Sequence, residues 1–261
     1  MIGQKRLKRY IKALLEEGTF PRFVILVGQT GSGKKTLLRE FFPDAIYLED
    51  SKIDSVRRLI DMAYKLNDRI FVLPDADSMS NGAKNALLKV VEECPNNNRF
   101  IMTLEDEVNT LVTIRSRAQI FYMDMYFPKD IKEYAATIDI TDEKELEVVE
   151  DVCETPGDVN TLKSSGIKDF YDYTNLVLDN IADVSLANAL KIPNKIAVKA
   201  DDAGFDLKLF LRMFMELCIR KNKGNVDWVM HTSKCLISLR TKAINKAMLL
   251  DRWIFEIRGV I

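Results

Sequence analysis

The chain has 261 residues, of which 47% are hydrophobic and 30% are charged, and its formal net charge is −1. This composition is typical of a folded protein, and at roughly 100–200 residues per domain the length predicts two or three domains. A balanced charge excludes a polybasic nucleic-acid coat and an acidic disordered chain. No run of about 18 apolar residues occurs, so we expect no membrane span.

Predicted strands and helices alternate in the first half of the chain. The opening stretch, residues 1–18, has the pattern of an amphipathic helix and lacks the apolar core and cleavage site of a signal peptide. Short apolar, β-branched runs predict five strands, at 23–28, 45–49, 69–74, 99–104 and within 114–123. Helical patterns fill the intervals, and one of them starts near Ser80 and ends before Pro95. The alternation predicts an α/β domain whose parallel sheet is covered on both faces.

The second half of the chain is predicted to be helical. Three short helices are expected at 128–138, 141–152 and 155–165, the second with Thr141 as a plausible cap. Longer helices follow from about Asp169, and their segments are 169–181, 206–223 and 225–259. We therefore predict three domains: an α/β core at 1–123, a small helical domain at 124–168 and an all-helical domain at 169–261.

Charge is distributed unevenly over these domains. Residues 124–183 hold 5 lysines, no arginine and 16 acids, whereas the segments before and after them are net positive. Such changes in net charge between segments indicate either complementary binding surfaces or ordinary solvated surfaces, and charge alone does not decide between the two.

The four cysteines are far apart and form no CxxC pair: Cys94, Cys153, Cys218 and Cys235. This spacing argues against zinc and favours a reducing, cytoplasmic location.

A glycine-rich loop between the first strand and its helix has the pattern of a phosphate-binding loop. It comprises Gly28, Gln29, Thr30, Gly31, Ser32, Gly33, Lys34, Lys35 and Thr36. Glycines let backbone N–H groups turn toward a phosphate, the helix N-terminus adds partial positive charge, and Lys34 would reach the β- and γ-oxygens. The loop predicts a site for ATP or ADP.

One position departs from the pattern. The lysine of this motif is normally followed by Ser or Thr, whose hydroxyl holds Mg²⁺, but Lys35 stands there. Thr36 is rotated by about 100° around the helix and does not simply substitute. Lys35 either neutralises phosphate charge or is solvated. Mg²⁺ binding is therefore doubtful, and we assign no metal ligand.

Further motifs occur within residues 1–165. The run after the third strand is PDADSMSNGAKNALLKVVEECP (74–95), a later segment is IRSR (114–117), and residues 2–4 are Ile2-Gly3-Gln4. In these motifs the sequence resembles the clamp-loader branch of the AAA+ ATPases. The resemblance implies a AAA+ phosphate-loop domain with a parallel sheet, a small helical lid domain and a C-terminal collar-type helical domain that oligomerises.

The resemblance also implies that several of the family's catalytic residues are replaced in this sequence. The family's metal-holding and water-orienting acids fall on Pro74 and Asp75, so the first is missing and the second is a shorter aspartate, which on its own is equally a turn residue. The family's two sensor positions fall near Leu104-Glu105 and on Asp158, and an acid there would repel a phosphate. Asp77 caps the following turn or supplies an alternative metal ligand.

Arg117, in contrast to these positions, matches the arginine of the family's motif at 114–117. The resemblance implies that this arginine projects into a neighbouring subunit's site, where such fingers contribute about 10³–10⁵ in rate. The alternative is that Arg117 is a surface or ion-paired arginine without this role. Arg115 takes the role if the alignment with the family's motif is shifted.

By resemblance, the chain is expected to be a clamp-loader subunit of DNA replication that is not itself a competent ATPase. It would bind nucleotide weakly or structurally and supply Arg117 to a neighbouring ATPase during loading of the sliding clamp. The implied partners are other clamp-loader subunits in a hetero-oligomeric ring, the sliding clamp and primed DNA. Two rivals stay open: an active AAA+ ATPase that uses Asp75 or Asp77 for Mg²⁺, and a scaffold without nucleotide.

Two helices of the predicted first domain carry basic residues that, by resemblance, would face DNA. These are Arg57, Arg58 and Lys84, and a solvated position is the simpler expectation for all three.

Overall fold

The computed structural model describes residues 2–183, 185–189, 191–200, 205–221, 226–239 and 244–259. The chain divides into two compact units, residues 1–126 and 127–261. Each unit has its own architecture and is considered separately.

The first unit is built on a five-stranded parallel sheet. Its strands are β1 (Phe23–Val27), β2 (Ile46–Tyr47), β3 (Ile70–Leu73), β4 (Arg99–Leu104) and β5 (Gln119–Tyr122). They lie in the order β2-β3-β4-β1-β5, and every neighbouring pair is parallel. The predicted parallel sheet is confirmed, and the carboxyl ends of its strands share one edge.

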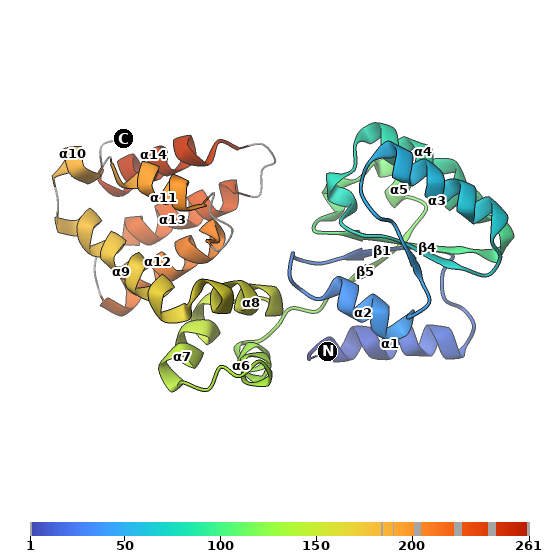
Figure 1. Cartoon of the computed structure of the whole chain (residues 1–261), viewed down its shortest axis with the longest axis horizontal. Coiled ribbons are helices and arrows are strands. Elements are labelled where there is room, and N and C mark those ends of the chain that lie inside the picture. Colours follow the sequence, from blue (N-terminus) through green and yellow to red (C-terminus); the bar gives the residue numbers. More distant parts are fainter. Residues whose placement is uncertain are drawn as a thin grey trace. The chain divides into compact units, whose positions relative to one another are not determined.

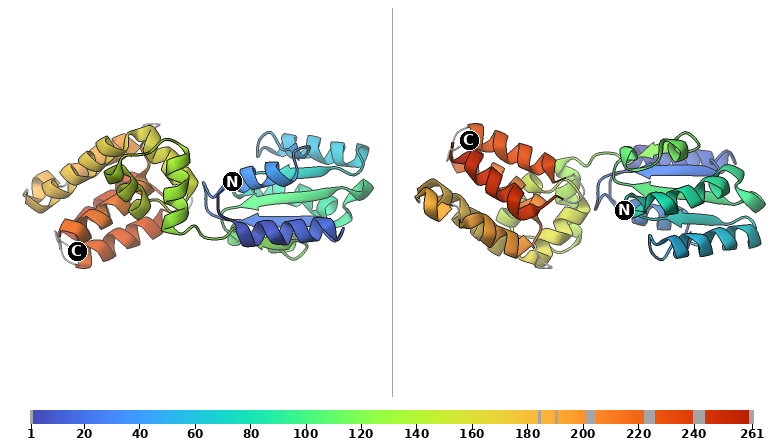
Figure 2. Two further views of the ribbon diagram at one scale, coloured as in Figure 1. Left: turned by 90° about the horizontal axis from the view of Figure 1, so that it is seen from below. Right: turned by 90° about the horizontal axis from the view of Figure 1, so that it is seen from above.

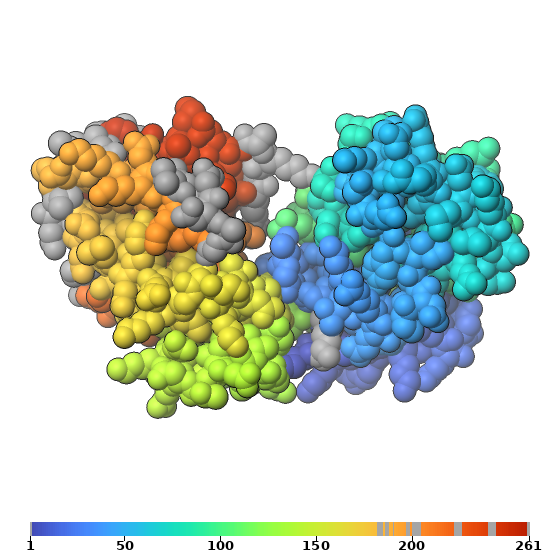
Figure 3. Space-filling view, in the orientation of Figure 1, coloured from blue at the N-terminus to red at the C-terminus, as the bar shows by residue number. Residues whose placement is uncertain are grey.

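Helices cover both faces of this sheet (Figure 1). They are α1 (Lys5–Glu16), α2 (Lys34–Phe41), α3 (Ile53–Lys65), α4 (Asn81–Glu93) and α5 (Val112–Arg115), with short 3₁₀ turns at Ala76–Ser78, Pro95–Asn97 and Glu107–Asn109. Helices α3, α4 and α5 pack on one face, and α1 and α2 pack on the other. In the space-filling view their side chains largely hide the strands (Figure 3).

The core follows from the strand sequences, because successive side chains of a buried strand alternate between the two faces. Phe71 and Phe100 stack on the α3–α4 side with ring centroids 5.4 Å apart, whereas Leu26 and Ile101 face α1 and α2. Each such side chain contributes about 1.5–3 kcal/mol when fully buried.

Helix α4 begins as predicted, since the Ser80 hydroxyl accepts a hydrogen bond from the N–H of Ala83 at 3.2 Å. The helix ends at Glu93, and Cys94 follows in the left-handed region with φ 43°.

The second unit is all-helical. Its helices are α6 (Pro128–Thr137), α7 (Glu143–Val152), α8 (Pro156–Ser165), α9 (Ile167–Asp183), α10 (Leu186–Ala189), α11 (Ile192–Ala200), α12 (Leu207–Lys221), α13 (Val226–Ser238) and α14 (Lys246–Ile257). Helix α12 packs against α9 and α13, and α14 packs against α11 and α13 (Figure 2).

Two predictions for this unit are wrong in detail, and two helices were missed. The segment 225–259 forms two helices, α13 and α14, and the side chain of Asn245 caps the second by accepting from the N–H of Met248. Helix α7 is capped by Asp142 instead of Thr141, because the Asp142 carboxylate accepts from two N–H groups at 3.0 Å. Helices α10 and α11 were not predicted at all.

The predicted boundary between residues 168 and 169 falls within α9. Around it, α7 contacts α9 and α12, and Arg212 of α12 is ion-paired to Asp158 of α8 at 2.9 Å and to Glu154 at 2.5 Å. The division of the chain into three domains stays a prediction.

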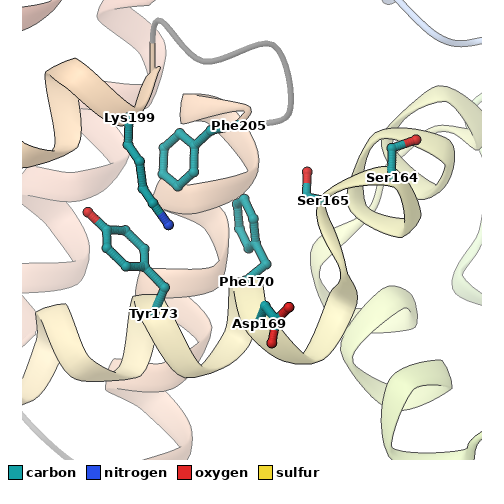
Figure 4. A pocket seen from close by; sticks show the side chains of 7 residues that line it. All are labelled: Ser164, Ser165, Asp169, Phe170, Tyr173, Lys199 and Phe205. Atoms are coloured by element: carbon teal, nitrogen blue, oxygen red, sulfur yellow. The ribbon is translucent and has the colours of Figure 1, made fainter.

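A pocket of about 280 Å³ opens between α8, α9, the end of α11 and Phe205, which precedes α12 (Figure 4). The Lys199 ammonium lies over the Tyr173 ring, 3.9 Å from its centroid, and Phe170 stacks on Phe205. The lysine thus fills the aromatic end of the pocket with a cation–π contact. Among the described residues, no helix is both long enough and apolar enough to cross a membrane.

Candidate nucleotide-binding site

The glycine-rich loop lies at the carboxyl edge of the sheet, between β1 and α2. Its first residue is fixed by the sheet, since the Gly28 N–H donates to the Leu104 carbonyl at 3.0 Å. A Cβ at Gly28 would lie 2.5 Å from Cγ of Met123, so only glycine fits there. Gly31 and Gly33 adopt φ of 81° and 86°, which L side chains rarely adopt. The loop thus has the strand–loop–helix context that a phosphate site requires.

Lys34 is the first residue of α2, and its side chain is buried beneath the loop. Its ammonium donates to the carbonyls of Gly28 at 2.5 Å and Gln29 at 3.0 Å. Burial lowers the pKa of Lys34 below its usual 10.5, and the nearby carboxylates of Asp75 and Asp77 partly oppose this effect. The ammonium is therefore desolvated and is bonded chiefly to neutral carbonyls, which an incoming anion would outcompete.

Two other segments lie near the loop, and one of them is bonded to it. The Tyr126 hydroxyl donates to the Ser32 carbonyl at 2.8 Å, and the Tyr126 ring packs against Gly3. The Gln4 amide pairs with the backbone of Asp124, donating to its carbonyl and accepting from its N–H, both at 2.7 Å. The predicted Ile2-Gly3-Gln4 segment therefore lies beside the phosphate loop.

The donors present fit a phosphate. Helix α2 has no side-chain cap at Gly33 and no acid in its first turn, so its first N–H groups and its dipole are open to an anion. The Ser32 hydroxyl is buried and has no hydrogen-bond partner among the described residues. A nucleotide phosphate would satisfy both sets of groups, with Lys34 supplying the counter-charge.

The metal positions are different. Lys35, at the usual hydroxyl position, is ion-paired to Asp75, with 2.6 Å between Nζ and Oδ2. Asp75 itself has φ 50°, and its N–H donates to the buried Thr103 hydroxyl. The residue before Asp75 is Pro74, which has no side-chain donor atom. Thr36 is exposed on the surface of α2.

Asp77 anchors a neighbouring loop. Its carboxylate accepts from the N–H of Glu105 at 2.8 Å and from the side-chain amide of Asn109 at 3.0 Å. Among the described residues, no group of three or more His, Cys, Asp and Glu side chains is arranged to hold a metal ion. A lysine, a proline and an engaged aspartate are a poor donor set for Mg²⁺, which prefers carboxylate and water oxygens.

Arg117 lies at the amino ends of the strands, whereas the phosphate loop lies at their carboxyl ends. It precedes β5, whose first residue Gln119 is opposite Val24, near the start of β1. Its guanidinium donates from Nε to Glu92 at 3.1 Å and from Nη1 to the Thr113 carbonyl at 2.8 Å. The side chain is 36% exposed.

One expectation about a charged residue is corrected by the structure. Lys84 is neither solvated nor on a free face, because its ammonium is buried and donates to the Asn109 carbonyl at 2.5 Å. Asp158 is engaged within its own unit, where it completes a capping box with Thr155 and pairs with Arg212. Arg57 and Arg58 are exposed, each with a carboxylate partner.

Sequence reasoning missed the pairing of Lys35 with Asp75 and the anchoring of the loop by Tyr126. The first had a signal, since opposite charges occupy the metal-binding hydroxyl position of the loop and the water-orienting position after β3. The second had none, because nothing in the local pattern links Tyr126 to Ser32.

Comparisons with known proteins give partial matches. Residues 43–126 match the family model described as "DNA polymerase III, delta subunit". A segment of 75 residues is 33% identical to DNA polymerase III subunit delta' of Yersinia pestis, covering 27% of this chain and 22% of that protein. Over 155 residues the chain is 26% identical to the replication factor C small subunit of Methanoregula boonei, covering 51% of this chain and 47% of that protein.

The chain therefore spans less than half the length of these curated relatives. Among solved structures, the Thermotoga maritima RuvB Holliday junction branch migration motor superposes with a TM-score of 0.54 at 17% identity. That superposition covers 99% of this chain and 88% of the motor, and at this identity it shows a shared AAA+ fold alone. Together, the fold, the loop and these partial matches support a resemblance to the clamp-loader family of AAA+ proteins.

Proposed function

We propose that this chain is a delta-prime-like clamp-loader subunit, which binds ATP or ADP without hydrolysing it and supplies Arg117 to a neighbouring ATPase subunit. In this role it works with other clamp-loader subunits, the sliding clamp and primed DNA. The observation that carries the proposal is the ion pair between Lys35 and Asp75. The position that would supply a metal-binding hydroxyl in a hydrolase and the position that would orient water are instead bonded to each other.

Nucleotide binding is supported by the donors around the loop. Lys34, the first N–H groups of α2 and the Ser32 hydroxyl all face the position of a phosphate in such loops. A bound triphosphate would draw the Lys34 ammonium away from the Gly28 and Gln29 carbonyls. Binding therefore costs two hydrogen bonds that are already made, which fits a weak or structural site.

Hydrolysis would require an oriented water and a metal ion that offsets the charge on the phosphates. Asp75 is the nearest candidate to orient a water, but its carboxylate is neutralised by Lys35. Breaking this exposed pair costs only about 0–1 kcal/mol. The obstacle is therefore one of chemistry: Lys35 offers no lone pair to a metal while it is protonated.

The position of Arg117 supports action on another subunit. Strand β5 separates it from the edge that carries the phosphate loop, and four residues of strand span about 13 Å. Arg117 therefore lies a strand length away from its own loop, and we infer that any phosphate it reaches belongs to a neighbour. Its ion pair with Glu92 is half exposed and stabilises the chain by about 0–1 kcal/mol. Replacing Glu92 by a phosphate as the partner of Arg117 therefore costs little free energy.

The direct test is reconstitution with candidate motor subunits, the clamp and primed DNA, with ATPase rate as the readout. Wild-type chain should accelerate hydrolysis, and Arg117→Ala should lose at least about tenfold of the acceleration, within the range for arginine fingers. Arg115→Ala is the matched control and should behave as wild type. Equal stimulation by wild type and Arg117→Ala would remove the finger from the proposal.

A further inference from the structure

Lys35 carries its positive charge from the phosphate loop to Asp75, across the carboxyl end of the sheet. Lys35 lies on α2, which follows β1, and Asp75 follows β3, with β4 between those two strands. Their ion pair, with 2.6 Å between Nζ and Oδ2, therefore spans the end of β4. Ligands of open parallel sheets bind in the crevice at this edge. A positive charge of the chain itself thus lies beside the loop, where the metal-binding positions Lys35 and Pro74 offer no side-chain oxygen.

The Lys35 ammonium keeps hydrogen-bond donors for a second partner. A lysine ammonium has three N–H donors, and within the part of the chain that the structure describes, the Asp75 carboxylate is the one group it bonds. Both side chains are open to solvent, with 50% of Lys35 and 60% of Asp75 exposed. An anion can therefore approach this ammonium without displacing Asp75.

Asp75 is the fixed member of the pair. Its N–H donates to the buried Thr103 hydroxyl at 2.9 Å, and its carbonyl accepts from the Ser78 hydroxyl at 2.8 Å. Because both backbone groups are held, the carboxylate keeps the flexible Lys35 side chain at the carboxyl end of the sheet. An unpaired Asp75 would repel a phosphate at this place. With Lys35 bonded to it, a positive charge separates the two anions.

The other groups around the loop increase the need for this charge. The Ser32 hydroxyl, in a residue that is 4% exposed, has no partner among the described residues, and the first turn of α2 has no side-chain cap. These groups and Lys34 attract a phosphate. Three carboxylates, those of Asp75, Asp77 and Glu105, lie near enough to Lys34 to raise its pKa against the effect of burial. A polyphosphate at the loop therefore needs a second ammonium besides Lys34.

On the basis of the nucleotide binding proposed above, we propose that Lys35 takes the electrostatic part of Mg²⁺ at this site. Its ammonium stays paired with Asp75 and also donates to the β- and γ-phosphates, the groups that a metal ion bridges in hydrolases. The ligand is then a nucleoside triphosphate that is held without help from a divalent cation. Because the charge belongs to the chain, binding does not depend on the Mg²⁺ concentration.

Titration calorimetry with ATP and ADP in EDTA tests this directly. Lys35→Gln should weaken ATP binding by about tenfold or more, a difference of about 1.4 kcal/mol. The loss for ADP should be about threefold or less, because ADP has no γ-phosphate to lose contact with Lys35. Lys35→Arg keeps the charge and should stay within about threefold of wild type. Lys89→Gln removes an exposed lysine from α4 and is the matched control, which should bind as wild type does.

The outcomes separate this inference from the proposed function. Equal ATP binding by wild type and Lys35→Gln would overturn the role of Lys35 and leave nucleotide binding in place, and an equal loss for ATP and ADP would overturn the γ-phosphate contact. If Lys35→Gln does not fold, wild type decides the question: equal ATP affinity in EDTA and in Mg²⁺ supports the inference, and binding in Mg²⁺ alone overturns it. Absence of nucleotide binding by wild type in both buffers would overturn the proposed function as well.

Discussion

Lys35 and Asp75, 40 positions apart in the chain, form an ion pair at the carboxyl edge of the parallel sheet, with 2.6 Å between the ammonium and the carboxylate. One residue follows the phosphate-loop lysine and the other follows β3. Parallel strands bring these two positions together whatever residues stand there. In this chain the junction carries a mutually neutralised pair, and the site around it keeps its phosphate donors.

Replacing Lys35 with threonine should restore a hydroxyl at this junction and release the Asp75 carboxylate. We expect the affinity for a fluorescent ATP analogue to become dependent on Mg²⁺, by about tenfold or more between Mg²⁺ and EDTA, since hydroxyl and carboxylate oxygens suit that ion. Wild type should show little difference. The control is Lys35→Ala, which removes the charge without adding a hydroxyl. Identical Mg²⁺ responses in all three proteins would show that Lys35 does not control metal binding.

Nucleotide affinity should fall as the pH rises toward 10.5. Burial lowers the pKa of Lys34, with Asp75, Asp77 and Glu105 opposing. Phosphates favour the protonated form, so binding weakens as the pH passes upward through the depressed pKa. In the chain without nucleotide, the free energy of unfolding changes with pH in the opposite direction. The buried charge of Lys34 destabilises the fold at neutral pH, and this destabilisation disappears as the pH rises from the depressed pKa to 10.5.

Titrations of the ATP analogue over a pH series measure this effect. Lys34→Arg is the control, because a guanidinium stays charged over the whole range. Its affinity should be flat with pH where wild type declines. A parallel decline in both proteins would assign the effect to another group.

Removing the Tyr126 hydroxyl should loosen the phosphate loop. Tyr126→Phe loses the hydrogen bond to the Ser32 carbonyl, at a cost of about 0.5–1.5 kcal/mol in unfolding free energy, with weaker nucleotide binding. Tyr122→Phe loses an exposed bond to Glu107 and serves as the matched control. Denaturant unfolding and nucleotide titration on both variants check this. If the two variants were equally affected in nucleotide binding, Tyr126 would have no special role at the loop.

Arg212 should be a main determinant of stability in the second unit. Its side chain is 12% exposed and bonds Asp158 and Glu154, so Arg212→Met should lower the unfolding free energy by about 1–3 kcal/mol. Arg220 is a more exposed arginine on the same helix that pairs with Asp151 and Glu216, and Arg220→Met should cost about 1 kcal/mol or less. Thermal unfolding of both variants distinguishes them, and an equal loss would contradict the structural role given to Arg212.

The sequence predicted those parts of the fold that local patterns encode. Runs such as 23–27 and 99–104 are apolar and β-branched, and they form β1 and β4. Caps were harder, because Thr141 and Asp142 are both good capping residues and only the backbone conformation selects one. The break between α13 and α14 was missed because residues 239–245 contain no glycine or proline, and Asn245 was its one local sign.

At the site, the loop residues 28–36 were located from their pattern, whereas their partners were not. Contacts such as Lys35 with Asp75, or Lys84 with the Asn109 carbonyl, join residues that are far apart in the chain. Periodicity describes which face of an element is buried and does not identify such pairs. They depend on the order of the strands, which the sequence does not state.

The central claim is that this chain binds nucleotide and leaves hydrolysis to a neighbour. The most direct measurement is the ATP turnover of the purified chain at saturating ATP and Mg²⁺, beside Lys34→Ala as the background. The account predicts that the two rates are indistinguishable. A Lys34-dependent turnover of about 1 s⁻¹ or more, within the usual range for enzymes, would contradict it.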